Sequence, residues 1–463
     1  MRVTSITEYV GAAGTYLEWP VSIGDGMHSD VAPSFNQSFH LSAALGTGAE
    51  DTTTVWIAVA FDVPGRIDVD ALSWAFEQFV ERHPALRTSF FADDTGVRRR
   101  VHAPSEVEAG HPQRTPMLDP SELSMHVRAR MNALCHPSRS PSYSLAAVDR
   151  PDTSTILCGF DHAHVDAMSM TVAAEEIAAL YASRRTGRPH ALETVGSFVE
   201  YCRGEADTPA ADLADPRVAD WARFVDECGG TTPAFPFDLG VPLGQSAPQA
   251  TAVHTIASAD RAERFEAGCR DLGAGMFTGV VAALAQASSN IGGPKRFPLL
   301  FPLHTRRDPQ WARAVGWFTT NAPMTVTVGT DFDETVTNAH ASFRAALPLA
   351  AVPIPRVLEA LGEKFRRTRN DVFMVSYIDY RGVPGADCAR SNAHHISNVT
   401  TADDAQFWVS RTSNGLSLRS RFPDTPEARR VVENVATELA QVLAAHAVTT
   451  ADVDELSLVG PTA

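Results

Sequence analysis

Segments typical of β-strands alternate with segments typical of helices along this chain, and this order constrains its fold most. Residues 54–61 are rich in β-branched and aromatic side chains and predict a strand. Asp68 then stands where a helix cap is expected, before apolar residues at helical spacing: Leu72, Ala75, Phe76, Phe79 and Val80. This helix should end before Pro84, and residues 86–91 predict the next strand. The alternation predicts an α/β or α+β protein.

The length of the chain predicts two lobes. A single hydrophobic core rarely organises as many as 463 residues. Residues 191–250 are rich in Pro, Gly, Asp and Thr, and we interpret them as a connector. Residues 1–190 are then expected to form an N-terminal lobe, and residues 251–463 a C-terminal lobe.

The N-terminal lobe contains a polar loop at a strand-to-helix junction, and this loop is the predicted active-site loop. Residues 154–160 form an apolar strand, and residues 168–182 are strongly helix-forming. Between them lie His162 and Asp166, four positions apart. A neutral imidazole can take a proton from a hydroxyl or amine, and a nearby carboxylate can shape the loop that presents it.

Taken alone, this loop leaves three interpretations open. His164 lies between the other two residues, so His162, His164 and Asp166 could ligate zinc or iron in a hydrolytic site. However, the chain contains no second His and Asp cluster with matching spacing. The remaining interpretations are a catalytic base and a polar loop without chemistry.

Composition narrows the function further. Hydrophobic residues make up 44% and charged residues 20%, as in folded globular proteins. The net charge of −16, without any run of five or six Lys or Arg, argues against nucleic-acid binding. An acidic surface remains compatible with a neutral or lipidic substrate.

Several features predict a soluble, cytoplasmic protein. Its start lacks the basic and then apolar layout of a signal peptide, and no apolar run approaches the roughly 20 residues of a membrane span. At most, peripheral contact with a membrane is expected. The cysteines are widely spaced and form no C-x-x-C pair, which fits a reducing compartment. They are Cys135, Cys158, Cys202, Cys228, Cys269 and Cys388.

Several ordered motifs resemble those of the condensation-domain superfamily, whose fold is chloramphenicol-acetyltransferase-like. The superfamily signature H-H-x-x-x-D-G falls on residues 161–167, with its second histidine at His162 and its aspartate at Asp166. Asp161 replaces the first histidine, and Ala167 replaces the glycine. Other similar segments are Pro33–Gln37, Arg82–Phe90, Leu303–Arg306 and Val315–Pro323. Within the superfamily, the chain is most similar to stand-alone polyketide-associated (Pap-type) acyltransferases, including at Ala13–Trp19.

The resemblance implies a fold and a set of site residues. It implies two such lobes in a V-shaped pseudo-dimer with a central tunnel, and latch and floor segments in the C-terminal lobe. His162 would lie at the midpoint of the tunnel. Arg306 would pair with Asp166 and support the site. The implied tunnel residues are Trp317, Ser376 and Tyr377.

The resemblance also implies an acyltransferase of natural-product or lipid biosynthesis. The acyl donor would be a thioester on the phosphopantetheine of an acyl or peptidyl carrier protein, or on CoA, and the acceptor a small molecule or a lipid. A hydroxyl acceptor is favoured over an amine, and no metal or tightly bound cofactor is expected. His162 would act as general base or orient the acceptor. Asp161, a further candidate catalytic residue, raises the pKa of His162 if the two are close.

Two alternatives to this function remain. The changes at positions 161 and 167 suit a non-catalytic module that recruits a partner enzyme to a carrier-bound intermediate. The second alternative is the metal-dependent hydrolase that would use His162, His164 and Asp166.

Overall fold

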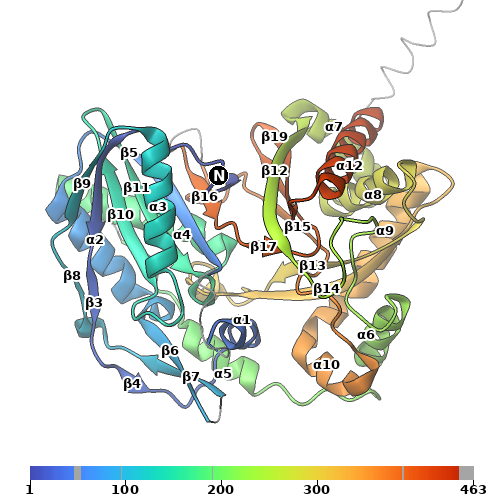
Figure 1. Cartoon of the computed structure of the whole chain (residues 1–463), viewed down its shortest axis with the longest axis horizontal. Helices are drawn as coiled ribbons and strands as arrows, with labels where there is room; N and C mark the ends of the chain where they lie inside the picture. Colours follow the sequence, from blue (N-terminus) through green and yellow to red (C-terminus); the bar gives the residue numbers. More distant parts are fainter. Residues whose placement is uncertain (46–53, 95, 190, 388–390, 448–463) are drawn as a thin grey trace, which may run out of the picture. The chain divides into compact units, whose positions relative to one another are not determined.

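The computed structural model describes residues 1–45, 54–94, 96–189, 191–387 and 391–447, which form two compact units (Figure 1). Unit 1 comprises Met1–Pro209, His304–Thr319 and Gly382–Thr400. Unit 2 comprises Ala210–Leu303, Thr320–Arg381 and the chain from Thr401 onward. Each unit combines a sheet with helices, which confirms the predicted mixed class. Cys388 lies outside the described residues, and the lobe and connector limits stay predictions.

A seven-stranded sheet forms the centre of unit 1. Its strands, in order across the sheet, are β1 (Arg2–Ser5), β16 (His394–Ser397), β5 (Trp56–Pro64), β11 (Thr153–Asp161), β10 (Tyr143–Asp149), β2 (Gly14–Trp19) and β9 (Gln113–Met117). The pair β1–β16 is parallel, and the other neighbours are antiparallel. Strand β16 therefore comes from a segment far along the chain and lies inside the sheet.

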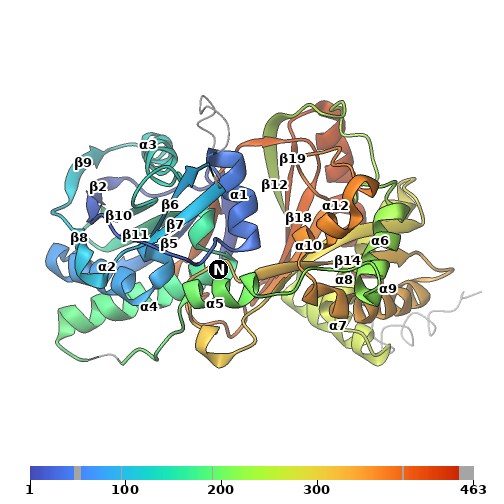
Figure 2. The same ribbon diagram turned by 90° about the horizontal axis from the view of Figure 1, so that it is seen from below.

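Helices cover both faces of this sheet. The helices of unit 1 are α1 (Phe35–Leu45), α2 (Val69–Arg82), α3 (Pro120–Leu134), α4 (Ala167–Thr186) and α5 (Phe198–Ala206). Figure 2 shows α3 on one side of the sheet and α2 and α4 on the other. The side chains of strand β5 alternate between the two faces of the sheet and are mostly buried on both. Trp56, Ala58 and Ala60 belong to the core cluster that includes α3 residues.

Two small sheets complete unit 1. One pairs β3 (Val21–Ile23) with β8 (Val107–Ala109), and the other orders β4 (Met27–His28), β7 (Gly96–Val101) and β6 (Thr88–Asp93). Strand β6 starts two residues later than the predicted strand, because Pro84–Arg87 form a 3-10 turn. Proline favours the first position of such a turn, where its missing N–H is not needed.

Unit 2 contains a second seven-stranded sheet. Its order is β14 (Thr319–Thr327), β13 (Arg296–His304), β15 (Met374–Asp379), β18 (Gln406–Thr412), β19 (Gly415–Pro423), β12 (Ala247–Ser258) and β17 (Thr401–Ala402). One face is covered by α7 (Ala259–Asp271), α8 (Met276–Asn290), α9 (Phe332–Ala346) and α12 (Pro426–Ala445). A separate cluster unites α6 (Pro216–Glu227) and α10 (Ile354–Leu361) with Leu300 and Met374 of the opposite face.

No single helix among the described residues is long and apolar enough to cross a membrane. Two helix pairs meet the length and composition criteria only when joined, and each pair bends sharply, by 98° and 85°.

Helix α2 forms as its sequence pattern predicts. Its predicted apolar face is buried, and Asp68 caps its N-terminus by accepting a hydrogen bond of 3.0 Å from the Ala71 N–H. The helix ends at Arg82, immediately before His83 and Pro84. The cap therefore fixes the start of the helix, and the proline fixes its end.

Asp68→Ala is expected to lower the free energy of unfolding by about 1 kcal/mol, because the Ala71 N–H loses its acceptor. Asp70→Ala is the matched control, since Asp70 is exposed in the first turn and should cost less. Urea unfolding followed by circular dichroism compares the two variants. Equal losses would show that the cap contributes nothing beyond the charge.

Candidate active site

Two aspartates frame the loop that follows β11, and each caps a helix. Asp161 accepts a 2.9 Å hydrogen bond from the Ala163 N–H and starts the 3-10 turn His162–His164. Asp166 accepts a 2.8 Å hydrogen bond from the Ser169 N–H and starts α4. The loop conformation is thus set by its own acidic residues, which satisfy N–H groups that a helix start leaves free.

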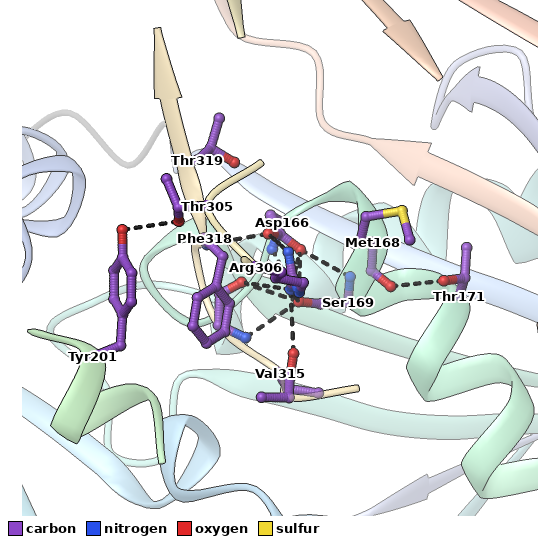
Figure 3. Close-up of polar contacts among 12 residues, drawn as sticks. Asp166, Met168, Ser169, Thr171, Tyr201, Thr305, Arg306, Val315, Phe318 and Thr319 are labelled. Atoms are coloured by element: carbon purple, nitrogen blue, oxygen red, sulfur yellow. Dashed lines mark hydrogen bonds and ion pairs between the residues drawn. The ribbon is translucent and has the colours of Figure 1, made fainter. Parts of the chain in front are cut away.

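Asp166 also forms a buried ion pair with Arg306 (Figure 3). The two guanidinium nitrogens bond both carboxylate oxygens, with Nη2 at 2.9 Å from Oδ1. Asp166 is 5% exposed and Arg306 is 9% exposed. This two-pronged geometry is the strongest form of such a pair, and it offsets the cost of burying both charges.

The segment that carries Arg306 is held against the start of α4 by further bonds. The Phe318 N–H donates to Asp166 Oδ2 at 3.1 Å, and the Gly316 N–H lies 3.2 Å from Ser169 Oγ. The Arg306 guanidinium lies 4.5 Å from the centre of the Phe318 ring. Asp166 is therefore the common anchor of α4 and the segment 304–319 (Figure 3).

The charge on Asp166 is stabilised despite its burial. Burial by itself raises the pKa of a carboxyl, but the Arg306 guanidinium and the bonds from Ser169 outweigh it and hold the pKa of Asp166 below its usual value. Asp166 is thus ionised at neutral pH, and its oxygens are already engaged. A carboxylate in this state supports the loop and does not move protons.

His162 is the partly exposed histidine of the loop. Its backbone N–H bonds the Val55 carbonyl at 3.0 Å, while its side-chain Nδ1 has no hydrogen-bond partner among the described residues. Burial and then the charge of His40 lower the pKa of His162. Asp161 acts in the opposite direction, as expected, but does not prevail. His162 is therefore neutral at pH 7 and able to accept a proton.

Trp317 is the aromatic neighbour of His162. The two ring centroids are 4.0 Å apart, and the ring planes are inclined by 31°. Trp317 is partly exposed, whereas the adjacent Phe318 is buried. The indole thus restricts the orientation of the imidazole and covers one side of it.

Asp161 has a long-range partner that sequence reasoning missed. His40 on α1 places its Nε2 at 3.0 Å and 3.1 Å from the two Asp161 oxygens, and Thr54 Oγ1 lies 3.4 Å from one of them. Asp161 is completely buried. A single sequence offers no signal for this pair, because 121 positions separate its members.

Gln37, from the first resembling motif, holds the loop from its other side. Its side-chain N–H donates to the Ala163 carbonyl at 2.7 Å, and its side-chain oxygen accepts from Arg99 Nη2 at 2.6 Å. All three residues are buried. The glutamine therefore satisfies a carbonyl inside the loop.

The Arg82-His83 motif supports the site from a distance. His83 Nε2 and Arg82 Nε bond Glu176 on α4 at 2.8 Å and 3.1 Å. On its other side, His83 Nδ1 accepts from the Val315 N–H at 3.4 Å. His83 thus links α2, α4 and the segment that carries Arg306.

The three residues of the metal hypothesis do not converge. His164 is 1% exposed, and its ring nitrogens bond Ser142 Oγ at 2.6 Å and the Ala85 carbonyl at 2.8 Å. Asp166 is engaged by Arg306. Across the part of the chain that the structure describes, no group of three His, Cys, Asp or Glu side chains is arranged to hold a metal ion. Of the three residues, His162 is the one that is partly exposed.

Ser376 and Tyr377 lie in unit 2, on β15. Neighbouring residues of a strand point to opposite faces of its sheet, so the two side chains do not share one environment. Tyr377 packs against the helix-covered core and near Phe277, and burial raises its pKa. Ser376 is 8% exposed, on the other face. Their role as tunnel residues stays a prediction.

Comparison with known proteins identifies the family. Residues 47–407 match the family model described as "Condensation domain", so this chain belongs to that family. The chain is 26% identical over 460 residues to the acyltransferase PapA3 of Mycobacterium tuberculosis, with 95% of each chain covered.

It is also similar to a second acyltransferase. Identity is 28% over 448 residues to the trehalose-2-sulfate acyltransferase PapA2 of Mycobacterium tuberculosis, covering 93% of this chain and 94% of the relative. A solved structure described as "PapA2 acyl transferase" superposes with a TM-score of 0.88 at 26% identity, covering 97% of this chain and all of the other. The chain is an acyltransferase of the Pap type, as the motifs predict.

Asp166→Ala is expected to lower the free energy of unfolding by about 3–5 kcal/mol, because it leaves the Arg306 charge buried without a partner. Arg306→Ala should cost a similar amount, and the double variant should cost clearly less than the sum of the two. Urea unfolding of the four proteins measures this coupling. Simple additivity would mean that the pair contributes no interaction of its own.

Proposed function

We propose that this protein transfers an acyl group from a thioester to a hydroxyl, with His162 as the general base. The observation that carries the proposal is the state of His162: a neutral imidazole on a partly exposed residue beside Trp317, with a buried Nδ1 that has no partner among the described residues. The donor is the phosphopantetheine thioester of a carrier protein or a CoA thioester. The fold and the relatives support acyl transfer as the class of reaction, and His162 is the group that would move the proton.

The transfer requires one mobile proton. His162 takes the proton of the acceptor hydroxyl as its oxygen attacks the thioester carbon. The C–O bond forms, the C–S bond breaks, and the proton passes from the imidazolium to the leaving thiolate. The products are an ester and a free thiol, so atoms and charges balance. Because a thioester is already activated, no covalent enzyme intermediate is needed.

The acceptor is proposed to be a carbohydrate or lipid hydroxyl. One relative is named for acyl transfer to trehalose-2-sulfate, and that name supports a sugar hydroxyl as the first acceptor to test. This chain carries a net charge of −16, which does not assist the approach of an anionic acceptor. Neutral trehalose and its 2-sulfate therefore form two arms of one assay, with an amino sugar as the third.

The assay combines the purified protein with acyl-CoA or an acyl-loaded carrier and each acceptor, followed by mass spectrometry. Formation of the ester supports the proposal. A carrier that binds without product formation across the acceptors would instead support the recruiting module. Thiol release with free acid as the only acyl product would indicate a thioester hydrolase and contradict acyl transfer.

His162→Ala is expected to reduce kcat/KM for acyl transfer by roughly a hundred- to ten-thousand-fold, the usual contribution of a general base. Its melting temperature should stay close to that of the parent, since the side chain makes no hydrogen bond through Nδ1. His28→Ala is the control, because His28 is exposed on β4 and lies outside the loop. Full activity in the His162 variant would refute the mechanism.

The pH profile offers an independent check on the base. The reaction needs unprotonated His162, and its pKa lies below the ordinary value of 6.5. The parent kcat/KM should therefore be flat from about pH 7 upward and fall only below pH 6.5. Thiol release from a CoA thioester, followed at constant ionic strength, measures the profile. An acid limb centred above pH 6.5 would contradict a neutral His162.

A further inference from the structure

A histidine–carboxylate pair, His40 with Asp161, involves the residue that precedes His162. Asp161 stands where the family motif has its first histidine, and His40 on α1 bonds both of its oxygens at 3.0 Å and 3.1 Å. The His40 side chain is 10% exposed and Asp161 is fully buried. The residue at this position thus binds an imidazole that comes from α1.

Asp161 sets the tautomer of His40. An ionised carboxylate can only accept, so Nε2 of His40 must donate, and a neutral ring then carries its lone pair on Nδ1. Among the described residues, Nδ1 has no hydrogen-bond partner. The same logic governs the aspartate of a Ser-His-Asp triad, which fixes the orientation and tautomer of its histidine.

His40 and His162 both lie against Trp317. The ring centroids of His40 and Trp317 are 6.1 Å apart and the planes are inclined by 71°, while the corresponding distance for His162 is 4.0 Å. This proximity has an electrical consequence. When His40 is protonated, its positive charge disfavours a second one nearby, and after burial the charge of His40 is the next cause that lowers the pKa of His162.

We propose that His40, held by Asp161, is a positioning residue of the acyl-transfer site that keeps His162 neutral while it meets the acceptor hydroxyl. This inference rests on the proposed role of His162 as the base. It assigns Asp161 a role distinct from that of Asp166. Asp161 orients an imidazole, whereas Asp166 joins two segments of chain.

The charged and titratable groups around His40 are compatible with this positioning role. Asp161 faces it from the end of β11, His162 and His164 from the loop, and His136 from beyond α3. Both ring nitrogens of His164 are already bonded, and burial lowers the pKa of His136. Asp161 is thus the carboxylate that His40 contacts.

His40→Gln separates charge from structure, because a glutamine amide can still donate to Asp161 but cannot titrate. The melting temperature should match that of the parent. The acid limb of the pH profile should move to higher pH, with kcat/KM falling about three- to tenfold at pH 6 and less at pH 8. His28→Gln is the control and should change neither quantity.

A measurement without substrate keeps this inference separate from the proposed function. Nuclear magnetic resonance of ¹⁵N-histidine-labelled protein gives the titration midpoint of His162 in the parent and in His40→Gln. A higher midpoint in the variant supports the inference even if no acyl transfer is found. Equal midpoints overturn it even if the parent is an active transferase whose activity depends on His162.

Asp161→Asn tests the tautomer. The amide oxygen can still accept from the Ala163 N–H at the Oδ1 position, while the amide nitrogen at the Oδ2 position faces His40 Nε2 and favours a ring proton on Nδ1. We expect a stable variant with an activity loss at least as large as that of His40→Gln, and a double variant no worse than Asp161→Asn alone. Asp161→Ala also removes the cap and should lose stability. Additive losses in the double variant would contradict a shared role.

Discussion

The ion pair between Asp166 and Arg306 is the interaction on which the rest of the site depends. It is buried, two-pronged and tied to the first turn of α4, so it fixes where the loop after β11 ends. Through Phe318 it also fixes the segment that places Trp317 against His162. A polar link of this kind tolerates little displacement, because a small shift would leave buried charges unpaired. The position of the His162 imidazole is thus constrained both by the loop that carries it and by Trp317.

The loop separates tasks that its sequence places side by side. Of its two acids, one closes a junction between chain segments and the other holds the imidazole of His40. Of its two histidines, His164 has both nitrogens bonded inside unit 1, whereas His162 is partly exposed and its Nδ1 has no partner among the described residues. Burial and neighbours, and not residue type, therefore decide which group is available for chemistry.

Local pattern predicted the elements with a strong period or cap, and motif resemblance predicted the loop and its arginine. Helix α2 starts at its predicted cap and ends where a proline requires it. What could not be predicted were contacts between distant positions. His40 with Asp161, Gln37 with Ala163, and β16 inside the first sheet leave no periodic trace in one sequence, because only the folded chain brings their members together. The sequence also left the metal alternative open. The residues whose atoms bond the two His164 nitrogens lie 22 and 79 positions away along the chain, so one sequence could not show that these nitrogens are engaged.

The position of β16 between β1 and β5 has a consequence for how this chain folds while the ribosome makes it. The first strand of the chain pairs with a strand that begins at residue 394, and the arginine that anchors the loop arrives at residue 306. A ribosome that has released only residues 1–209 has therefore made neither the neighbour of β1 nor the partner of Asp166. Domains generally fold as units during synthesis, but this one must wait until most of the chain has emerged. A truncated product would leave the edge of β1 unpaired and Asp166 without its arginine. Chaperones and proteases would be expected to recognise such a product.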